Sequence, residues 1–131
     1  MKDKIKRTIY KLIFLYFKLR FMKLSMNNLV IFDIDNTIAN TWPSFGENYQ
    51  NESERLFELK IFDNMFLMIK NYYNNTDAKL IFLTARDYRY FSVTKKWLKK
   101  HDIYDNNLFM VSKPSEKIIL LNTSMVKLNQ C

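Results

Sequence analysis

Beyond residue 26, the hydrophobic and polar positions of the chain form two kinds of segment. Apolar runs with the length of a strand occur at residues 29–33, 79–83 and 108–111. Segments with helical periodicity occur at 61–73, at 88–100 and from Pro114 onward. This alternation predicts an α/β fold, in which crossover helices connect the strands of a Rossmann-like parallel sheet.

The segments between the strands differ in character. Residues 61–73 carry apolar side chains on nearly every side, which predicts a well-buried helix. Residues 88–100 are amphipathic, with lysines on the solvent side and a core side marked by Tyr90, Val93 and Trp97. Residues 38–60 are polar and irregular, so we expect a loop insertion after the first strand.

Composition limits the possible chemistry. The 131 residues correspond to at most one ordinary domain with an apolar core. Gly46 is the only glycine, which excludes the glycine-rich phosphate loops of dinucleotide-binding and P-loop proteins. Cys131 is the only cysteine, so no internal disulfide can form, and a reducing, cytoplasmic location is expected.

The positive charge lies almost entirely in the first segment. Residues 1–26 hold eight Lys/Arg and one acid, whereas residues 27–131 hold thirteen Lys/Arg and twelve acids. The overall charge of +8 therefore gives no strong indication of nucleic-acid binding by the core. We divide the chain into a basic amphipathic segment, 1–26, and an α/β domain, 27–131.

The basic segment has three interpretations. Its longest uncharged run, residues 12–17, is too short to cross a bilayer, and no small-residue cleavage site follows it. Residues 1–24 could form a helix on an anionic membrane surface, which would make the protein membrane-peripheral. Alternatively, the helix packs on the core, or translation begins at Met22 or Met26. Since no candidate site residue lies here, deletion of 1–24 is predicted to leave the site intact.

Two acids, Asp33 and Asp35, come at the end of the first apolar run, in "LVIFDIDNT". Ligands of parallel α/β sheets bind at the carboxyl ends of the strands, and a buried acid is costly unless it is used or paired. Two carboxylates in one small pocket attract a hard cation such as Mg²⁺. One can then attack phosphorus while the other acts as an acid and base. The alternative is an ordinary Asx-type turn.

Two later segments supply groups that suit a phosphate ligand. "KLIFLTARD" places the hydroxyl of Thr84 at the end of the second strand. "VSKPSEK" places two lysines near the start of the last helix. Lys117 is the preferred phosphate ligand and Lys113 is its rival, because Pro114 puts Lys117 one turn into the helix.

With these three segments in order, the chain resembles the haloacid dehalogenase (HAD) superfamily over residues 27–121. "DIDNT" is similar to its first motif, with Asn36 where glycine is common, and "FLTAR" is similar to its second. The resemblance implies a Mg²⁺-dependent phosphomonoester hydrolase that acts on a small phosphorylated substrate. Asp33 would be nucleophile and metal ligand, and Asp35 would be acid/base and give the metal its backbone carbonyl. Thr84 and Lys117 would hold the phosphoryl group, and residues 38–59 would form a small cap.

The chain departs from this family after Leu121. The family's fourth motif, an acidic pair after another strand, has no counterpart in "NTSMVKLNQC". The core is therefore expected to be C-terminally incomplete, with the first strand at an exposed edge that the N-terminal segment or another subunit would cover.

The alternative function is a catalytically inactive HAD-like remnant that serves as a binding or membrane-associated module. The oligomeric state is not indicated by the sequence.

Overall fold

The computed structural model describes residues 2–25, 27–103 and 107–129, with side chains described up to residue 123; Cys131 lies outside these ranges. Its centre is a sheet of three parallel strands in the order β1 (Leu29–Phe32), β4 (Lys79–Ala85), β5 (Leu108–Val111). Phe32 pairs with Phe82, which in turn pairs with Leu108. The predicted α/β fold with a Rossmann-like parallel sheet is confirmed.

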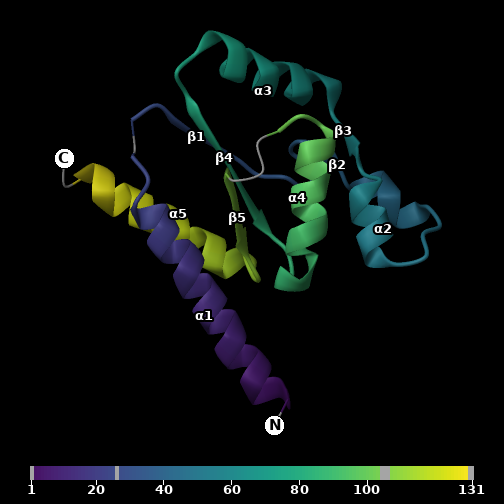
Figure 1. Cartoon of the computed structure of the whole chain (residues 1–131), viewed down its shortest axis with the longest axis horizontal. Coiled ribbons are helices and arrows are strands. Elements are labelled where there is room, and N and C mark those ends of the chain that lie inside the picture. Colours follow the sequence, from purple (N-terminus) through teal and green to yellow (C-terminus); the bar gives the residue numbers. More distant parts are fainter. Residues whose placement is uncertain (1, 26, 104–106, 130–131) are drawn as a thin grey trace.

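Helices cover both faces of the sheet (Figure 1). On one face, α3 (Asp63–Asn75) and α4 (Phe91–Lys100) form a core with the strands, with Ile69 and Trp97 fully buried. The short 3₁₀ helix η2 (Tyr88–Tyr90) leads into α4. On the other face lie α5 (Pro114–Asn129) and the N-terminal helix α1 (Lys2–Met22). Crossover helices are thus present in the predicted order.

The basic N-terminal segment packs on this second face. Phe17 and Phe21 are 3% and 1% exposed, and both rings lie against Phe109 of β5. The main contacts of α1 are with β5 and α5, so β1 remains an edge strand that α1 does not pair with. Of the three interpretations of this segment, the structure corresponds to a helix packed on the core. No helix in the described part of the chain has the length and hydrophobicity needed to cross a bilayer.

Residues 38–60 contain more regular structure than expected. A small antiparallel hairpin forms between β2 (Ala39–Asn40) and β3 (Lys60–Ile61), and it encloses η1 (Trp42–Gly46) and α2 (Glu52–Phe57). Asn51 caps the start of α2, because its side chain accepts a hydrogen bond from the Glu54 N–H at 2.8 Å. The prediction of a wholly irregular loop was wrong.

The prediction that residues 61–73 form a well-buried helix was also wrong. Among the residues of α3, only Ile69 is fully buried, whereas Leu67 is 66% exposed. The helix covers the sheet with one side, and its opposite side faces solvent. Apolar residues around most of a helix therefore did not indicate burial on all sides.

Candidate active site

The candidate residues lie at the carboxyl ends of the three strands. Asp33 follows β1 directly, Thr84 is the penultimate residue of β4, and the segment that leads to Lys117 follows β5. Because the strands are parallel, these positions share one edge of the sheet. The helix α5 begins just beyond, and Pro114 is its first residue.

Asp33 and Lys117 form an ion pair across this edge. The Lys117 Nζ lies 2.9 Å from Asp33 Oδ1, and the Ile34 N–H donates a hydrogen bond to the same oxygen at 2.8 Å. Lys117 comes from the helix after β5, and β4 lies between β5 and β1. The Asp33 side chain remains 38% exposed, so a ligand can reach the carboxylate. Lys113, the rival lysine, is exposed and lines a different cleft with Lys6, Arg7 and Lys11 of α1.

Thr84 is fully buried, and its hydroxyl has no hydrogen-bond partner in the described structure. The Thr84 hydroxyl is thus a buried polar group at the end of β4 that no described group satisfies. No hydrogen bond joins Thr84 to Asp33 or to Lys117. The structure therefore brings Asp33 and Lys117 together, and it leaves the Thr84 hydroxyl, near the end of the neighbouring strand β4, without a described partner.

A tight turn begins at Ile34, between the two acids, and includes Asp35. The carbonyl of Ile34 accepts hydrogen bonds from the backbone N–H groups of Thr37, Ile38 and Ala39. Asn36 has a φ of 59°, in the left-handed region that asparagine tolerates better than most residues. This turn gives Asp35 a different set of partners from Asp33.

The carboxylate of Asp35 is held by Arg86. The guanidinium donates to it twice, from Nε at 2.9 Å and from Nη2 at 2.7 Å, and the Thr41 hydroxyl donates at 2.8 Å. Arg86 is in turn fixed by Nη1, which donates to the hydroxyl of Thr94 at 3.0 Å. Burial acts to raise the pKa of Asp35, but the hydrogen bonds and the charge of Arg86 outweigh it, so this pKa lies below its usual value of 3.8.

Sequence reasoning did not identify this pairing. Arg86 was recognisable only as a basic residue next to Thr84, with no signal that it binds Asp35. Thr41, in the insertion, carried no signal at all. Both contacts depend on how the insertion and α4 approach the sheet edge, which the sequence pattern does not encode.

A cavity of about 390 Å³ opens beside Asp35. Its walls include Trp42 and Phe45 from η1, Arg55 from α2, and Arg86 and Tyr90 from the segment after β4. Trp42 and Phe45 are 72% and 63% exposed, and their rings meet edge to face. The insertion therefore supplies an aromatic wall to a cavity that has an acid at its base.

The helix α1 also contacts this end of the sheet. The hydroxyl of Tyr10 donates a hydrogen bond to Asp87, which follows Arg86 directly. Burial acts to raise the pKa of Asp87, but the Tyr10 hydroxyl and the Arg89 backbone N–H stabilise the carboxylate and the pKa is lowered. The N-terminal segment thus helps to position the loop that carries Arg86.

The groups available for a metal ion are few. No cluster of three or more Asp, Glu, His or Cys side chains occurs among the described residues. The Asp33 carboxylate and the Asp35 backbone carbonyl are hard oxygen donors. Such a pair fits Mg²⁺, which commonly binds through one or two carboxylates plus water and substrate phosphate, and does not fit an all-protein Ca²⁺ or Zn²⁺ site.

Comparisons with protein-family models, with curated proteins and with solved structures give no match. The findings on fold and geometry therefore come from this chain alone. They establish an α/β fold with the parallel sheet β1-β4-β5, crossover helices and a small antiparallel hairpin.

Proposed function

We propose that this protein is a Mg²⁺-dependent phosphomonoester hydrolase of the HAD type, which acts through a phosphoaspartyl intermediate on Asp33. The observation that carries the proposal is the 2.9 Å contact between Lys117 Nζ and Asp33 Oδ1. A carboxylate that attacks a phosphate must approach negatively charged oxygens. A cation held beside the nucleophile reduces that repulsion, and it can also bind the phosphoryl oxygens.

In the first step, Asp33 forms a bond to phosphorus while the bond from phosphorus to the leaving oxygen breaks. In the second step, water attacks the phosphoaspartate, releases phosphate and restores the carboxylate. Asp35 takes the proton of this water. Mg²⁺, held by the Asp33 carboxylate and the Asp35 carbonyl, would neutralise charge on the phosphoryl oxygens. The unpaired hydroxyl of Thr84 donates a hydrogen bond to one of these oxygens.

The environment of Asp35 supports a particular kind of substrate. Because its pKa is lowered, Asp35 is ionised at neutral pH, so it can accept a proton in the second step and is a poor acid for the first. Substrates whose leaving group departs without a proton are therefore favoured. The aromatic wall formed by Trp42, Phe45 and Tyr90 fits a flat leaving group. We infer that aryl phosphates, or esters with similarly acidic leaving groups, are the preferred class.

A second candidate is a catalytically inactive module that binds a phosphate group. It is favoured by the three donated hydrogen bonds that hold Asp35 and by the small number of acids near Asp33. In that case Lys117 and Thr84 would still bind phosphate, but no turnover would follow.

The test measures turnover of an aryl phosphate with Mg²⁺ and with EDTA, together with vanadate affinity. Turnover should depend on Mg²⁺ and should disappear in Asp33→Asn. Asp102→Asn is the matched control, because this acid is exposed and lies beyond the far end of α4. Vanadate binding without turnover would favour the inactive module. Turnover that persists in Asp33→Asn, or an absence of both turnover and vanadate binding, would refute the proposal.

A further inference from the structure

The helix α1 has two apolar faces, and within the described part of the chain only one of them packs against other elements. Phe17 and Phe21 mark the face that is buried against the sheet. The opposite face carries large apolar side chains that are 47–61% exposed: Ile5, Ile9, Leu12, Leu15, Tyr16 and Leu19. We call these six residues the outer stripe. At about 100° per residue, Leu12 and Leu19 project roughly opposite to Phe17.

The outer stripe is continuous along the helix. Positions 5, 9, 12, 16 and 19 are spaced alternately by four and three residues, which keeps them in one row. The row is about 21 Å long, from the rise of an α-helix. In Figure 1, the N-terminal half of α1 extends past the rest of the fold, and the side chains of the row are 47–61% exposed along its whole length. Single exposed apolar residues are ordinary, but a stripe of six on one side of a helix indicates an interaction surface.

Basic residues flank the outer stripe on both sides. Residues 2–22 hold seven Lys/Arg and a single acid, Asp3. On the helical wheel, Lys4 and Lys11 border one side of the stripe, and Lys2 and Arg20 border the other. Asp3 lies toward the buried face. The outer half of the helix thus combines an apolar row with positive charge only.

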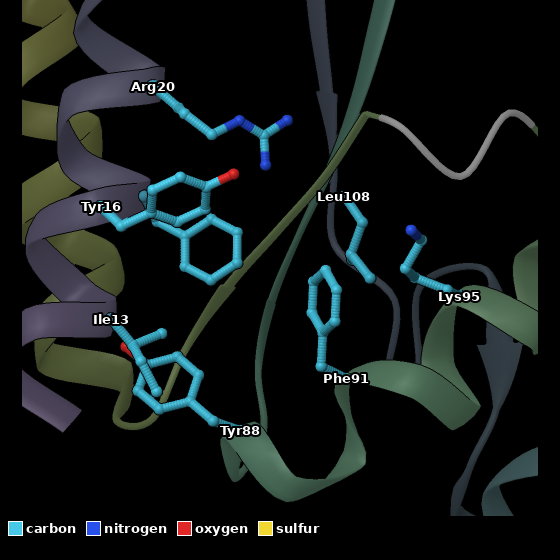
Figure 2. A pocket seen from close by; sticks show the side chains of 8 residues that line it. Ile13, Tyr16, Arg20, Tyr88, Phe91, Lys95 and Leu108 are labelled. Carbon is cyan, nitrogen blue, oxygen red and sulfur yellow. The ribbon is translucent and has the colours of Figure 1, made fainter. Parts of the chain in front are cut away.

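A cavity of about 660 Å³ adjoins the outer stripe (Figure 2). Tyr16 lines it and is also part of the stripe, and Phe17, Tyr88 and Phe91 supply further aromatic walls. Arg20 reaches toward it from α1, and Lys95 reaches toward it from α4 on the other side. The hollow thus adjoins the outer stripe with mainly apolar and aromatic walls.

These observations decide between two occupants. A second copy of the chain would place one positively charged helix against another, and the repulsion would oppose pairing through the stripe. An anionic phospholipid surface offers an apolar layer beneath a negative one, which matches both the stripe and its flanks. We propose that α1 binds an anionic lipid surface through its outer stripe, while its inner face stays packed on the sheet. This proposal does not depend on the proposed enzymatic activity.

The experiment measures flotation of the full chain with vesicles of phosphatidylcholine alone and of phosphatidylcholine mixed with phosphatidylglycerol. Binding should require phosphatidylglycerol and should weaken with salt, because the charges that attract the helix are exposed to solvent. The double variant Leu12→Gln/Leu19→Gln should bind more weakly by at least roughly tenfold, since two apolar side chains no longer enter the lipid. Its matched control is Leu67→Gln/Met68→Gln on α3, which alters two similarly exposed apolar residues and should bind normally.

A second pair of variants tests the charge. Lys4→Glu/Lys11→Glu should abolish binding, whereas Lys96→Glu/Lys99→Glu, on the exposed side of α4, changes the net charge equally and should retain it. Thermal melts confirm that each variant is folded. Equal binding to both kinds of vesicle, or no binding, would overturn the proposal. A dimer in sedimentation that dissociates in Leu12→Gln/Leu19→Gln would also overturn it in favour of a second copy.

Discussion

Arg86 and Asp35 are 51 residues apart in the chain, and the guanidinium of Arg86 makes two hydrogen bonds to the carboxylate of Asp35. Arg86 is 7% exposed, so its charge depends on this pairing. The ion pair joins the turn after β1 to the loop after β4. It therefore couples the geometry of the site to the stability of the fold.

The first prediction concerns how the free energy of unfolding depends on pH in acid. Because the pKa of Asp35 is lower in the folded state than its usual value of 3.8, the ionised carboxylate stabilises the fold above about pH 4. That contribution is lost as the pH falls through the folded-state pKa. Asp35→Asn should lower the free energy of unfolding by about 3 kcal/mol at neutral pH, because it leaves Arg86 without an anionic partner. Urea titrations at several pH values should show the difference shrinking in acid. An equal loss at every pH would contradict this role, and Asp102→Asn is the control.

The second prediction concerns Thr84. Thr84→Val should leave the unliganded protein as stable as the parent or slightly more stable, by up to about 1 kcal/mol, because it removes a buried hydroxyl that lacks a partner. The same change should weaken vanadate binding. Thr94→Val is the contrasting variant, since the Thr94 hydroxyl accepts from Arg86 and donates to the Tyr90 carbonyl, and its loss should destabilise the fold. Destabilisation by Thr84→Val with unchanged vanadate affinity would show that the hydroxyl serves the fold alone.

The third prediction compares the two lysines at the start of α5. Lys117→Ala should reduce vanadate affinity by roughly tenfold or more, because Lys117 lies 2.9 Å from the proposed nucleophile. Lys113→Ala should have a smaller effect, since this side chain is exposed and lines the cleft beside α1. Isothermal titration of both variants gives the comparison directly. A larger loss in Lys113→Ala would reverse the assignment.

The fourth prediction concerns the N-terminal helix. The sequence predicted that residues 1–24 could be deleted without effect on the site, but Phe17 and Phe21 are core residues and Tyr10 contacts Asp87. We now expect deletion to unfold the domain. Phe21→Ala should lower the free energy of unfolding by about 3–5 kcal/mol. Leu12→Ala, on the outer stripe, should change it by no more than about 0.5 kcal/mol. Similar melting temperatures for the two variants would mean that α1 does not pack as described.

The fifth prediction concerns the leaving group and rests on the proposed function. Since Arg86 keeps Asp35 ionised, turnover should fall steeply as the leaving group of an aryl phosphate series becomes more basic. Arg86→Met should raise the pKa of Asp35 and flatten this dependence, and a thermal melt checks that the variant is folded. A parent enzyme that is indifferent to the leaving group would show that Asp35 acts as an effective acid.

Several features were determined by the sequence alone. The apolar run at 108–111 coincides with β5, and the run at 29–33 differs from β1 by one residue. β5 is buried at every residue, whereas β1 is fully buried only at Phe32, yet both strands are apolar throughout and so leave a local signal in the sequence. Pro114 also marked the start of α5 in the sequence, because proline suits the first turn of a helix. The segregation of charge into the first 26 residues is likewise a property of composition, which no folding step alters.

The tertiary structure decided which face of each helix is buried and which charges meet. In α3, apolar residues surround most of the helix, and only the approach of the sheet selects Ile69 over Leu67 for burial. The helix α1 has two apolar faces, and packing against Phe109 selects one of them. The partners of Asp33 and Asp35, Lys117 and Arg86, are distant in the chain. Such contacts depend on strand order and on the placement of crossover helices, so they leave no periodic signal in the residues themselves.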